Sequence, residues 1–600
     1  MAKTKRIPGR NQVKTRDTWD LTPLFKSDAA WERAYKRLQK EVARYETFRG
    51  KLKKSPAVLH ACCAFDFGFQ QKMERLANYA FLKSAEDVGD GRYQAMMAKY
   101  MRLATRAEEA ASFIPPEIRS IPKTTMAKFL RARVLAPYRY HLERLLRYRP
   151  HILSTKEERL LAMQGEVTQT PSNAFGQLTD VDFDFGFVTN ETGERIELTQ
   201  SSLITLYESP KRAVRKRAFD KFYAVYEAHG HTLAALLNGA VLQDVYEARA
   251  RNHPSAREAA LFPDKVPVAV YDNLIETVRA NLDTLYGYLE LRRKALGVRS
   301  LHIYDCYVPI TKTKRTKTKY DQAVETVCDA LSPLGADYCR VLRKGLQGRW
   351  VDRYENKGKR SGAFSAGGYK GPPYILMNYK EETIDSAFAL AHEAGHSMHT
   401  YYSARSQPFQ YYDYSLFVAE VASTVNERLL AHYLLARAKD RRTRAYLINK
   451  QIDEIRAIVI RQTMFAEFEK TLHGLVEAGE PLTLESIRSD YRRLLQRYFG
   501  PDFVIDEPLT LEGLRIPHFY RAFYVYKYAT GYSAAIALSE GLLHGGKHAR
   551  DRYRAFLKAG GSKYPLEVLR EAGVDLAKPE PVEKGMAHFR DLVDELQELV

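Results

Sequence analysis

The segment His392-Glu393-Ala394-Gly395-His396 lies inside a strong helix signal and carries more information about this chain than any other segment. Two histidines four residues apart lie on one face of a helix, about one turn from each other, where both imidazoles can bind one zinc ion. Glu393 then reaches the water that completes the coordination of such an ion, so it can act as a general base. Gly395 lowers helix propensity, so we expect another segment to pass close to the backbone there. The alternative is a buried helix whose histidines only satisfy hydrogen bonds in the core.

A catalytic zinc site takes three protein ligands and keeps one position for water, so a third ligand is required. His399 lies on nearly the same helix face, but its Cα is about 10 Å from that of His392 along the axis. We therefore expect His399 behind the ligands or beside the substrate. Glu420 stands in an otherwise apolar run, where a carboxylate is costly to bury unless it is paired or binds a metal, and it is the predicted third ligand. Glu427 lies two turns further on the same face, where it can accept the free N–H of a ligand histidine or be an ordinary exposed residue.

With these residues in place, the chain resembles the thimet-oligopeptidase family of zinc metallopeptidases, and its oligoendopeptidase F branch more closely. The resemblance extends over most of the chain, from Trp19 to about Glu540. Besides the metal motif and Glu420, it rests on Trp19-Asp20-Leu21, Leu153-Ser154, Ala260 to Asp264, Ser361 to Ser365, Pro373 to Tyr379 and Arg515 to Tyr520. It implies a mainly α, zincin-like molecule: a multi-lobed helical clamp with the zinc in a deep channel that admits short unfolded peptides.

The segment from His518 to Gly531 combines a histidine with several tyrosines. Hydrogen-bond donors aimed at the carbonyl oxygen lower the barrier to peptide hydrolysis, and the resemblance implies that a histidine and tyrosines of this region have that role. We favour His518, Tyr524 and Tyr526, with Tyr520 next. The sequence leaves open which of the tyrosines, Tyr528 included, faces the zinc. An aromatic helix face packed into the core is the alternative for some of these rings.

Glycines and prolines between residues 361 and 373 predict turns, followed by a short apolar strand from Tyr374 to Tyr379. An extended peptide can add to a sheet edge through main-chain hydrogen bonds, with little side-chain selectivity. We therefore expect a small β element that lines the substrate cleft. Other strand signals cover Val181 to Leu198 and Leu301 to Pro309.

Six hundred residues exceed what one core usually supports, so several packed lobes are expected. We divide the chain into a disordered basic N-terminus (1–15), a helical N-terminal region (16–115), an oligopeptidase-type N-terminal lobe (116–200) and a catalytic lobe (201–600). Helical patterns dominate and cover residues 28–53, 92–113, 211–250, 267–297, 383–404, 415–438, 443–478 and 517–540.

The formal net charge is +20, and basic clusters such as 211–217 and 312–319 can bind nucleic acid or anionic lipid without specificity. No nucleic-acid module accompanies them, so we expect solvated surfaces, with 312–319 as a loop, and no specific nucleic-acid partner. No run approaches the length of an apolar membrane span, and five cysteines without framework spacing favour a cytoplasmic protein with reduced thiols.

Together these features predict a zinc-dependent endopeptidase that hydrolyses internal bonds of short oligopeptides. One Zn²⁺ ion is held by His392, His396 and Glu420, and Glu393 is the general base. An exopeptidase of the same family is the nearest alternative. A basic nucleic-acid or anion-binding protein with a structural zinc is a more distant alternative. The sequence does not indicate the oligomeric state.

Overall fold

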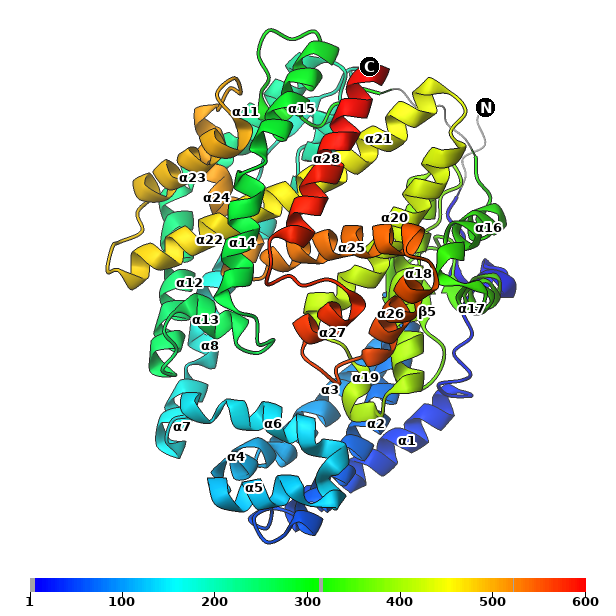
Figure 1. The fold of residues 1–600 in the computed structure, drawn as a ribbon, viewed down its shortest axis with the longest axis vertical. Helices are drawn as coiled ribbons and strands as arrows, with labels where there is room; N and C mark the ends of the chain where they lie inside the picture. Colours follow the sequence, from blue (N-terminus) through cyan, green and yellow to red (C-terminus); the bar gives the residue numbers. More distant parts are fainter. Residues whose placement is uncertain (1–5, 312–316, 522) are drawn as a thin grey trace. The chain divides into compact units, whose positions relative to one another are not determined.

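The protein is described here from a computed structural model that covers residues 6–311, 317–521 and 523–600. The expected mainly α architecture is confirmed: helices dominate, and the two sheets are small (Figure 1). The chain forms two compact units, each assembled from three stretches of sequence. Unit 1 comprises Met1–Pro150, Arg315–Tyr433 and Leu538–Val574, and unit 2 comprises His151–Lys314, Leu434–Ala537 and Asp575–Val600. The division of the sequence at residues 115 and 200 stays a prediction.

Unit 1 contains the metal motif. Its N-terminal helices form one hydrophobic core that also takes in Tyr374 and Leu376 from the sheet. Its helices are α1 (Asp28–Glu41), α2 (Pro56–Glu86), α3 (Gly91–Ala111), α4 (Ile114–Ser120), α5 (Lys123–Arg131), α6 (Arg139–Arg147), α16 (Tyr320–Ala330), α17 (Ala336–Gln347), α18 (Asp385–Ser406), α19 (Phe409–Tyr412), α20 (Leu416–Arg437), α26 (Gly546–Ala559) and α27 (Pro565–Ala572). The last residues of α20 belong to unit 2. Helix α18 packs against α26 and α16.

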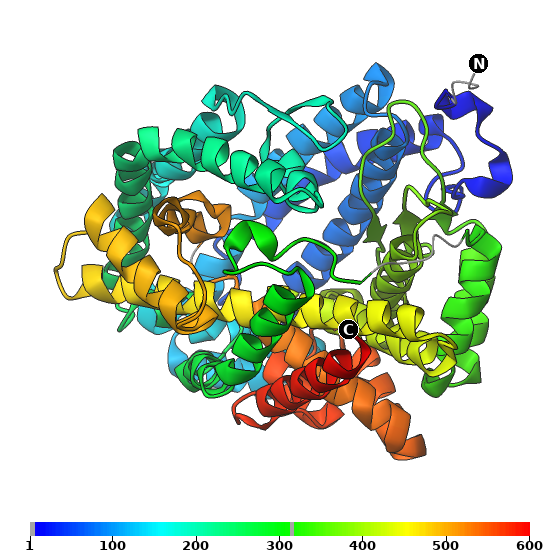
Figure 2. The same ribbon diagram turned by 90° about the horizontal axis from the view of Figure 1, so that it is seen from above.

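Two long helices, α21 and α22, organise the packing of unit 2. Helix α22 contacts α12 and α14, and α21 lies beside the C-terminal helix α28 (Figure 2). Its helices are α7 (Thr155–Met163), α8 (Gly165–Thr168), α9 (Thr170–Gln177), α10 (Gln200–Tyr207), α11 (Arg212–Ala228), α12 (Gly230–Ala250), α13 (Ala256–Leu261), α14 (Val268–Arg279), α15 (Leu282–Ala295), α21 (Arg441–Ile455), α22 (Arg461–Glu477), α23 (Leu484–Phe499), α24 (Glu512–Arg515), the first part of α25 (Tyr526–His544) and α28 (Glu580–Leu599). Within the described residues, no helix is both long and apolar enough to cross a membrane.

A three-stranded sheet in unit 1 precedes the metal helix. Strands β3 (Val351–Asp352) and β4 (Phe364–Ala366) flank β5 (Tyr374–Leu376), which pairs parallel with β3 and antiparallel with β4. The predicted strand from Tyr374 to Tyr379 is therefore confirmed over its first three residues, whereas 377–379 are not in a strand. However, it is the fully buried central strand, so its edges are already paired and cannot accept a peptide.

Some of the other strand and helix predictions are confirmed and others are wrong. The strand signal over 181–198 is confirmed in part: β1 (Phe187–Thr189) and β2 (Arg195–Glu197) pair antiparallel, whereas residues 181–182 belong to a π-helical turn. The predicted strand from Leu301 to Pro309 is wrong, because only Leu301 forms an isolated bridge and a 3₁₀ turn follows. Buried Asp305 explains the turn: its carboxylate accepts a hydrogen bond from the His302 amide and pairs with Arg215. The predicted helices 211–250 and 517–540 are each interrupted, at His229 and before Tyr526.

The expected disorder of residues 1–15 does not hold for the part that the structure describes. Residues 1–5 lie outside the described residues, but Arg10 begins a 3₁₀ turn and its guanidinium lies 2.6 Å from Asp352. Arg10 also pairs with Glu86, which accepts a hydrogen bond from the indole of Trp19. Buried carboxylates thus bind the basic N-terminal segment. Most of the predicted loop 312–319 also lies outside the described residues.

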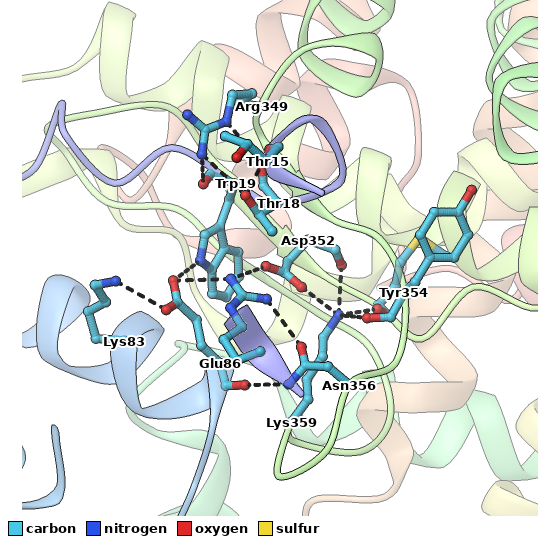
Figure 3. A network of polar contacts seen from close by, with 12 residues as sticks. Thr15, Thr18, Trp19, Lys83, Glu86, Arg349, Asp352, Tyr354, Asn356 and Lys359 are labelled. Atoms are coloured by element: carbon cyan, nitrogen blue, oxygen red, sulfur yellow. Dashed lines mark hydrogen bonds and ion pairs between the residues drawn. The ribbon is translucent and has the colours of Figure 1, made fainter. Parts of the chain in front are cut away.

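The same polar network contains a fully buried ion pair. Figure 3 shows Lys359 beside Asp352, with 2.6 Å between Nζ and Oδ1 and no solvent exposure of either side chain. The ammonium also donates to the main-chain carbonyls of Tyr354 and Met377. The network therefore links β3 to Met377, the residue that follows β5.

We expect Lys359→Met to lower the free energy of unfolding by about 3 kcal/mol, because it leaves a buried carboxylate without one of its two cationic partners. Thermal unfolding followed by circular dichroism measures the change. Lys357→Met, at an exposed position two residues away, is the matched control. Equal melting temperatures for the two variants would contradict a stabilising role for the buried pair.

Candidate metal centre

Helix α18 holds the two histidines as the spacing predicts. The Nε2 atoms of His392 and His396 lie 3.1 Å apart, and both side chains are half-buried. The segment that leads into the motif contains no proline and is rich in alanine, so the helix continues through both ligands without a break.

Helix α20 brings Glu420 to the same point. Its Oε2 atom lies 3.3 Å from Nε2 of His392 and 3.4 Å from Nε2 of His396, and it accepts a hydrogen bond from Ser423. Ligands about 2.0–2.1 Å from a tetrahedral zinc ion stand about 3.3 Å from one another. The three atoms therefore match the spacing that such an ion requires. The predicted ligands converge within unit 1.

Gly395 explains how the two helices come so close. A Cβ atom at this position would lie 2.5 Å from the Cα atom of Ser423 and 2.6 Å from the carbonyl oxygen of Ala422. The predicted close approach of another segment is thus confirmed, and that segment is α20. Buried Asn426 adds a specific link that the sequence analysis missed, because its amide donates to the carbonyl oxygen of Ala391 on α18. A fully buried amide in an apolar run is the signal that would have identified it.

We expect Gly395→Ala to push α18 and α20 apart and thereby weaken metal binding. Overpacking of this kind costs about 1–3 kcal/mol, and it falls on the contact that sets the distance from Glu420 to the histidines. Metal content after dialysis and the melting temperature report the change. Gly68→Ala is the control, because Gly68 lies inside α2 with open space around its Cα, so better helix propensity should leave stability equal or higher. Wild-type metal content in Gly395→Ala would refute the argument.

Glu427 lies behind the ligands, as predicted. Its Oε1 atom is 3.4 Å from Nδ1 of His392, the ring nitrogen that faces away from the other ligands. Burial alone would lower the pKa of His392, but the carboxylates of Glu420 and Glu427 raise it to about 10. The imidazoles of His392 and His396 in turn hold the pKa of Glu420 well below its usual range, against the effect of burial. The site is therefore built to stabilise positive charge, which a metal dication supplies in place of the proton.

Glu393 projects from the same helix into a cavity of about 500 Å³. Its side chain is largely buried, and burial raises the pKa of its carboxyl while the two neighbouring imidazoles oppose that effect. A nearby dication would lower the pKa again. The cavity is lined by Ala363, Phe364, Ser365, Ala366, Gly367, His392, Glu393, His396, Thr400, Tyr412, Asp413, Tyr414, Leu416, Ala419 and Glu420.

A β element lines this cavity, but it is β4 and not the strand that the sequence indicated. Residues Phe364 to Ala366 line the cavity, and β4 is an edge strand, because β5 is its only partner strand among the described residues. The hydroxyl of Ser365 lies 2.8 Å from that of Ser397 on α18, which ties the strand to the metal helix. The free edge of β4 is available for main-chain hydrogen bonds to a peptide.

The aromatic candidates belong to unit 2. His518 lies in a 3₁₀ turn (Pro517–Tyr520), and its ring centroid is 6.0 Å from those of Tyr524 and Tyr528, all three being partly exposed. Burial and Arg521 lower the pKa of His518, so its imidazole is neutral near pH 7.

Two other tyrosines of this segment pack inside unit 2. Tyr526 is fully buried, with its ring 5.1 Å from that of Tyr271, which fits the core-packing alternative. Tyr520 stacks on Phe175 at 4.3 Å. The catalytic roles of His518, Tyr524 and Tyr526 stay predictions.

Comparison with protein families gives two matches that together cover most of the chain. Residues 205–588 match the model for peptidase family M3, and residues 117–185 match the model named Oligopeptidase F. The family M3 match contains all three converging ligand residues and Glu393.

Individual relatives agree with the family match. The chain is 43% identical to Oligopeptidase PepF of Bacillus subtilis over 599 residues, which cover 100% of this chain and 89% of that protein. It is 38% identical to an Oligoendopeptidase F homolog of Borreliella burgdorferi, covering 98% of this chain and 99% of the relative. Among solved structures, oligoendopeptidase-F from Enterococcus faecium is 34% identical, with a TM-score of 0.75 and coverage of 95% and 99% of the two chains.

Proposed function

Because this chain belongs to peptidase family M3 and is a metallo-endopeptidase, we propose that it is zinc-dependent and cleaves internal bonds of short oligopeptides. One zinc ion is held by His392, His396 and Glu420. The observation that carries the proposal is the convergence of three ligand atoms at 3.1–3.4 Å, beside a buried glutamate in a peptide-sized cavity.

Bound zinc would supply a Lewis acid that activates water and polarises the scissile carbonyl. Glu393 accepts the proton of the attacking water on its carboxylate and passes it to the leaving amine. Glu427 holds the imidazole of His392 in the orientation that presents Nε2 to the metal. The edge of β4 binds the peptide main chain, so substrates of many sequences can be accommodated.

His518 and Tyr524 are proposed donors to the developing oxyanion. A neutral imidazole and a phenol are both suitable donors, and their rings lie together on unit 2 with exposed surface. The burial of Tyr526 against Tyr271 supports a packing role for that ring instead. The proposed setting is the cytoplasm, which the five buried free cysteines support.

The test is cleavage of a mixture of quenched peptides of about 5 to 20 residues, a range that suits a cavity of this size. The reaction is run with and without a chelator, and zinc, cobalt and magnesium are added back separately. Product masses locate each cut. We expect internal cuts that vanish with the chelator and return with zinc.

Two outcomes would overturn the proposal. Cuts confined to one residue at a peptide terminus would establish an exopeptidase. Full activity in the presence of the chelator, with no metal detected in the protein, would remove the metal from the mechanism.

A further inference from the structure

His399 has no place among the metal ligands, yet it is almost completely buried on the metal helix, three residues after His396. Its ring lies face to face with that of Tyr414, with centroids 3.6 Å apart and planes at 4°. Only 1% of its surface is exposed, and its Nδ1 atom has no hydrogen-bond partner among the described residues. His399 is not among the residues that line the cavity, and its ring stacks on the ring of Tyr414.

Tyr414 itself belongs to the wall of the catalytic cavity. It precedes α20 and lines the cavity together with Glu393, His396 and Glu420. Its hydroxyl lies 3.1 Å from that of Thr400, which also lines the cavity. Thr400 follows His396 by four residues, so it continues the helix face that carries the metal ligands. The phenol oxygen is therefore located on the ligand side of the cavity.

The hydrogen bonds of this pair leave one donor unused. Each of the two hydroxyls has one proton, and the bond between Tyr414 and Thr400 takes only one of them. The phenol oxygen has no other partner among the described residues. Either hydroxyl can be the donor in this contact. When Thr400 donates to the phenol oxygen, the phenol proton is the unused one, and a phenol keeps its proton at neutral pH. A peptide in the cavity presents main-chain carbonyl oxygens as acceptors, whatever its sequence.

The position of Thr400 is itself constrained. Gly367, at the end of β4, packs so closely that a Cβ atom there would lie 2.5 Å from the methyl carbon of Thr400. The threonine side chain therefore has little freedom to turn away from the phenol. Stacking on one side and a hydroxyl contact on the other limit the motion of the Tyr414 ring.

We propose that Tyr414 binds the substrate by donating a hydrogen bond to a main-chain carbonyl of the peptide in the catalytic cavity, and that His399 is the positioning residue that holds its ring. The inference rests on the proposed function, because it requires that peptides occupy this cavity. It adds a sequence-independent contact from the same unit that carries the metal ligands.

The first test is Tyr414→Phe, which keeps the stacked ring and removes the donor. Loss of one hydrogen bond to substrate should raise KM about 5- to 15-fold while kcat changes less than about threefold. Zinc content and melting temperature should match those of the wild type. Tyr402→Phe is the control, because it removes a phenol from α18, the helix of His399, at a position that does not line the cavity. An unchanged KM for Tyr414→Phe would overturn the proposal.

The second test addresses the role of His399 in positioning the ring of Tyr414. His399→Phe keeps a flat ring and should retain the wild-type KM. His399→Leu removes the flat face and should raise KM as Tyr414→Phe does. The double variant His399→Leu/Tyr414→Phe should then be no worse than the poorer single variant, because both changes remove the same substrate contact. Additive losses, or a raised KM for His399→Phe, would overturn the role of His399.

Parallel assays separate this inference from the proposed function. If wild-type cleavage does not respond to the chelator, the proposed function fails and the inference falls with it. If the chelator stops wild-type cleavage but Tyr414→Phe behaves like the control, only the inference about Tyr414 fails.

Discussion

Glu393→Gln is expected to lower kcat by about 10³-fold or more while the protein keeps its metal. General acid–base catalysis contributes about 10²–10⁴-fold, and an amide of the same shape cannot accept the proton of the attacking water. The ligand atoms of His392, His396 and Glu420 are untouched, so zinc content measured by plasma emission spectroscopy should equal that of the wild type. Single-turnover cleavage of a quenched peptide measures the chemical step directly.

The control is Glu382→Gln, an exposed glutamate shortly before the metal helix, whose carboxylate lies 3.7 Å from the ammonium of Lys317 at the surface. It should leave kcat unchanged, because exposed ion pairs contribute little. A Glu393→Gln variant that bound zinc and retained more than a tenth of wild-type kcat would show that another group accepts the proton.

Glu420→Ala is expected to lose the metal and, with it, activity. The substitution removes one of three ligand atoms and leaves the two imidazoles without the carboxylate that faces both of them. Removal of a residue that hydrogen-bonds to a metal ligand lowers metal affinity by about 10–100-fold. Removal of the ligand Glu420 itself should lower zinc affinity by more than that. Zinc affinity is measured by competition with a chromogenic chelator.

Glu427→Ala provides the matched comparison, because Glu427 contacts the other nitrogen of His392. We expect its zinc affinity to fall by about 10–100-fold, so that high zinc concentrations restore activity. If Glu420→Ala and Glu427→Ala lost affinity equally, the assignment of Glu420 as ligand and Glu427 as supporting residue would be wrong.

The helical architecture was predictable where apolar residues recur along one side of a helix, as in α18 and α20. Helix α2 was missed, because its apolar residues, among them Leu59, Cys63 and Phe69, are distributed around the helix and show no clear period. The break before α25 was also missed. There Phe523 adopts a positive φ of 52° and its amide donates to buried Glu469 on α22. Such a distant contact leaves no local pattern.

The ligands of the metal centre, in contrast, could largely be predicted from short segments of the sequence. His392, Glu393 and His396 share one helix, so their geometry follows from the rise and turn of that helix alone. Glu420 was recognisable because a carboxylate in an apolar run is costly unless something binds it. The direction of Glu427 follows from the same helical period.

Contacts between helices and strands that are distant in the sequence could not be predicted from local patterns. Three features depend on contacts between residues of different elements. They are the close approach of α20 to Gly395, the unpaired edge of β4, and the stacking of Tyr414 on His399. Side-chain packing at the interior selects such contacts, and it depends on the shapes of all the neighbours together. Helical spacing could therefore predict which residues bind the metal, whereas the wall that receives the peptide could be found only in the tertiary structure.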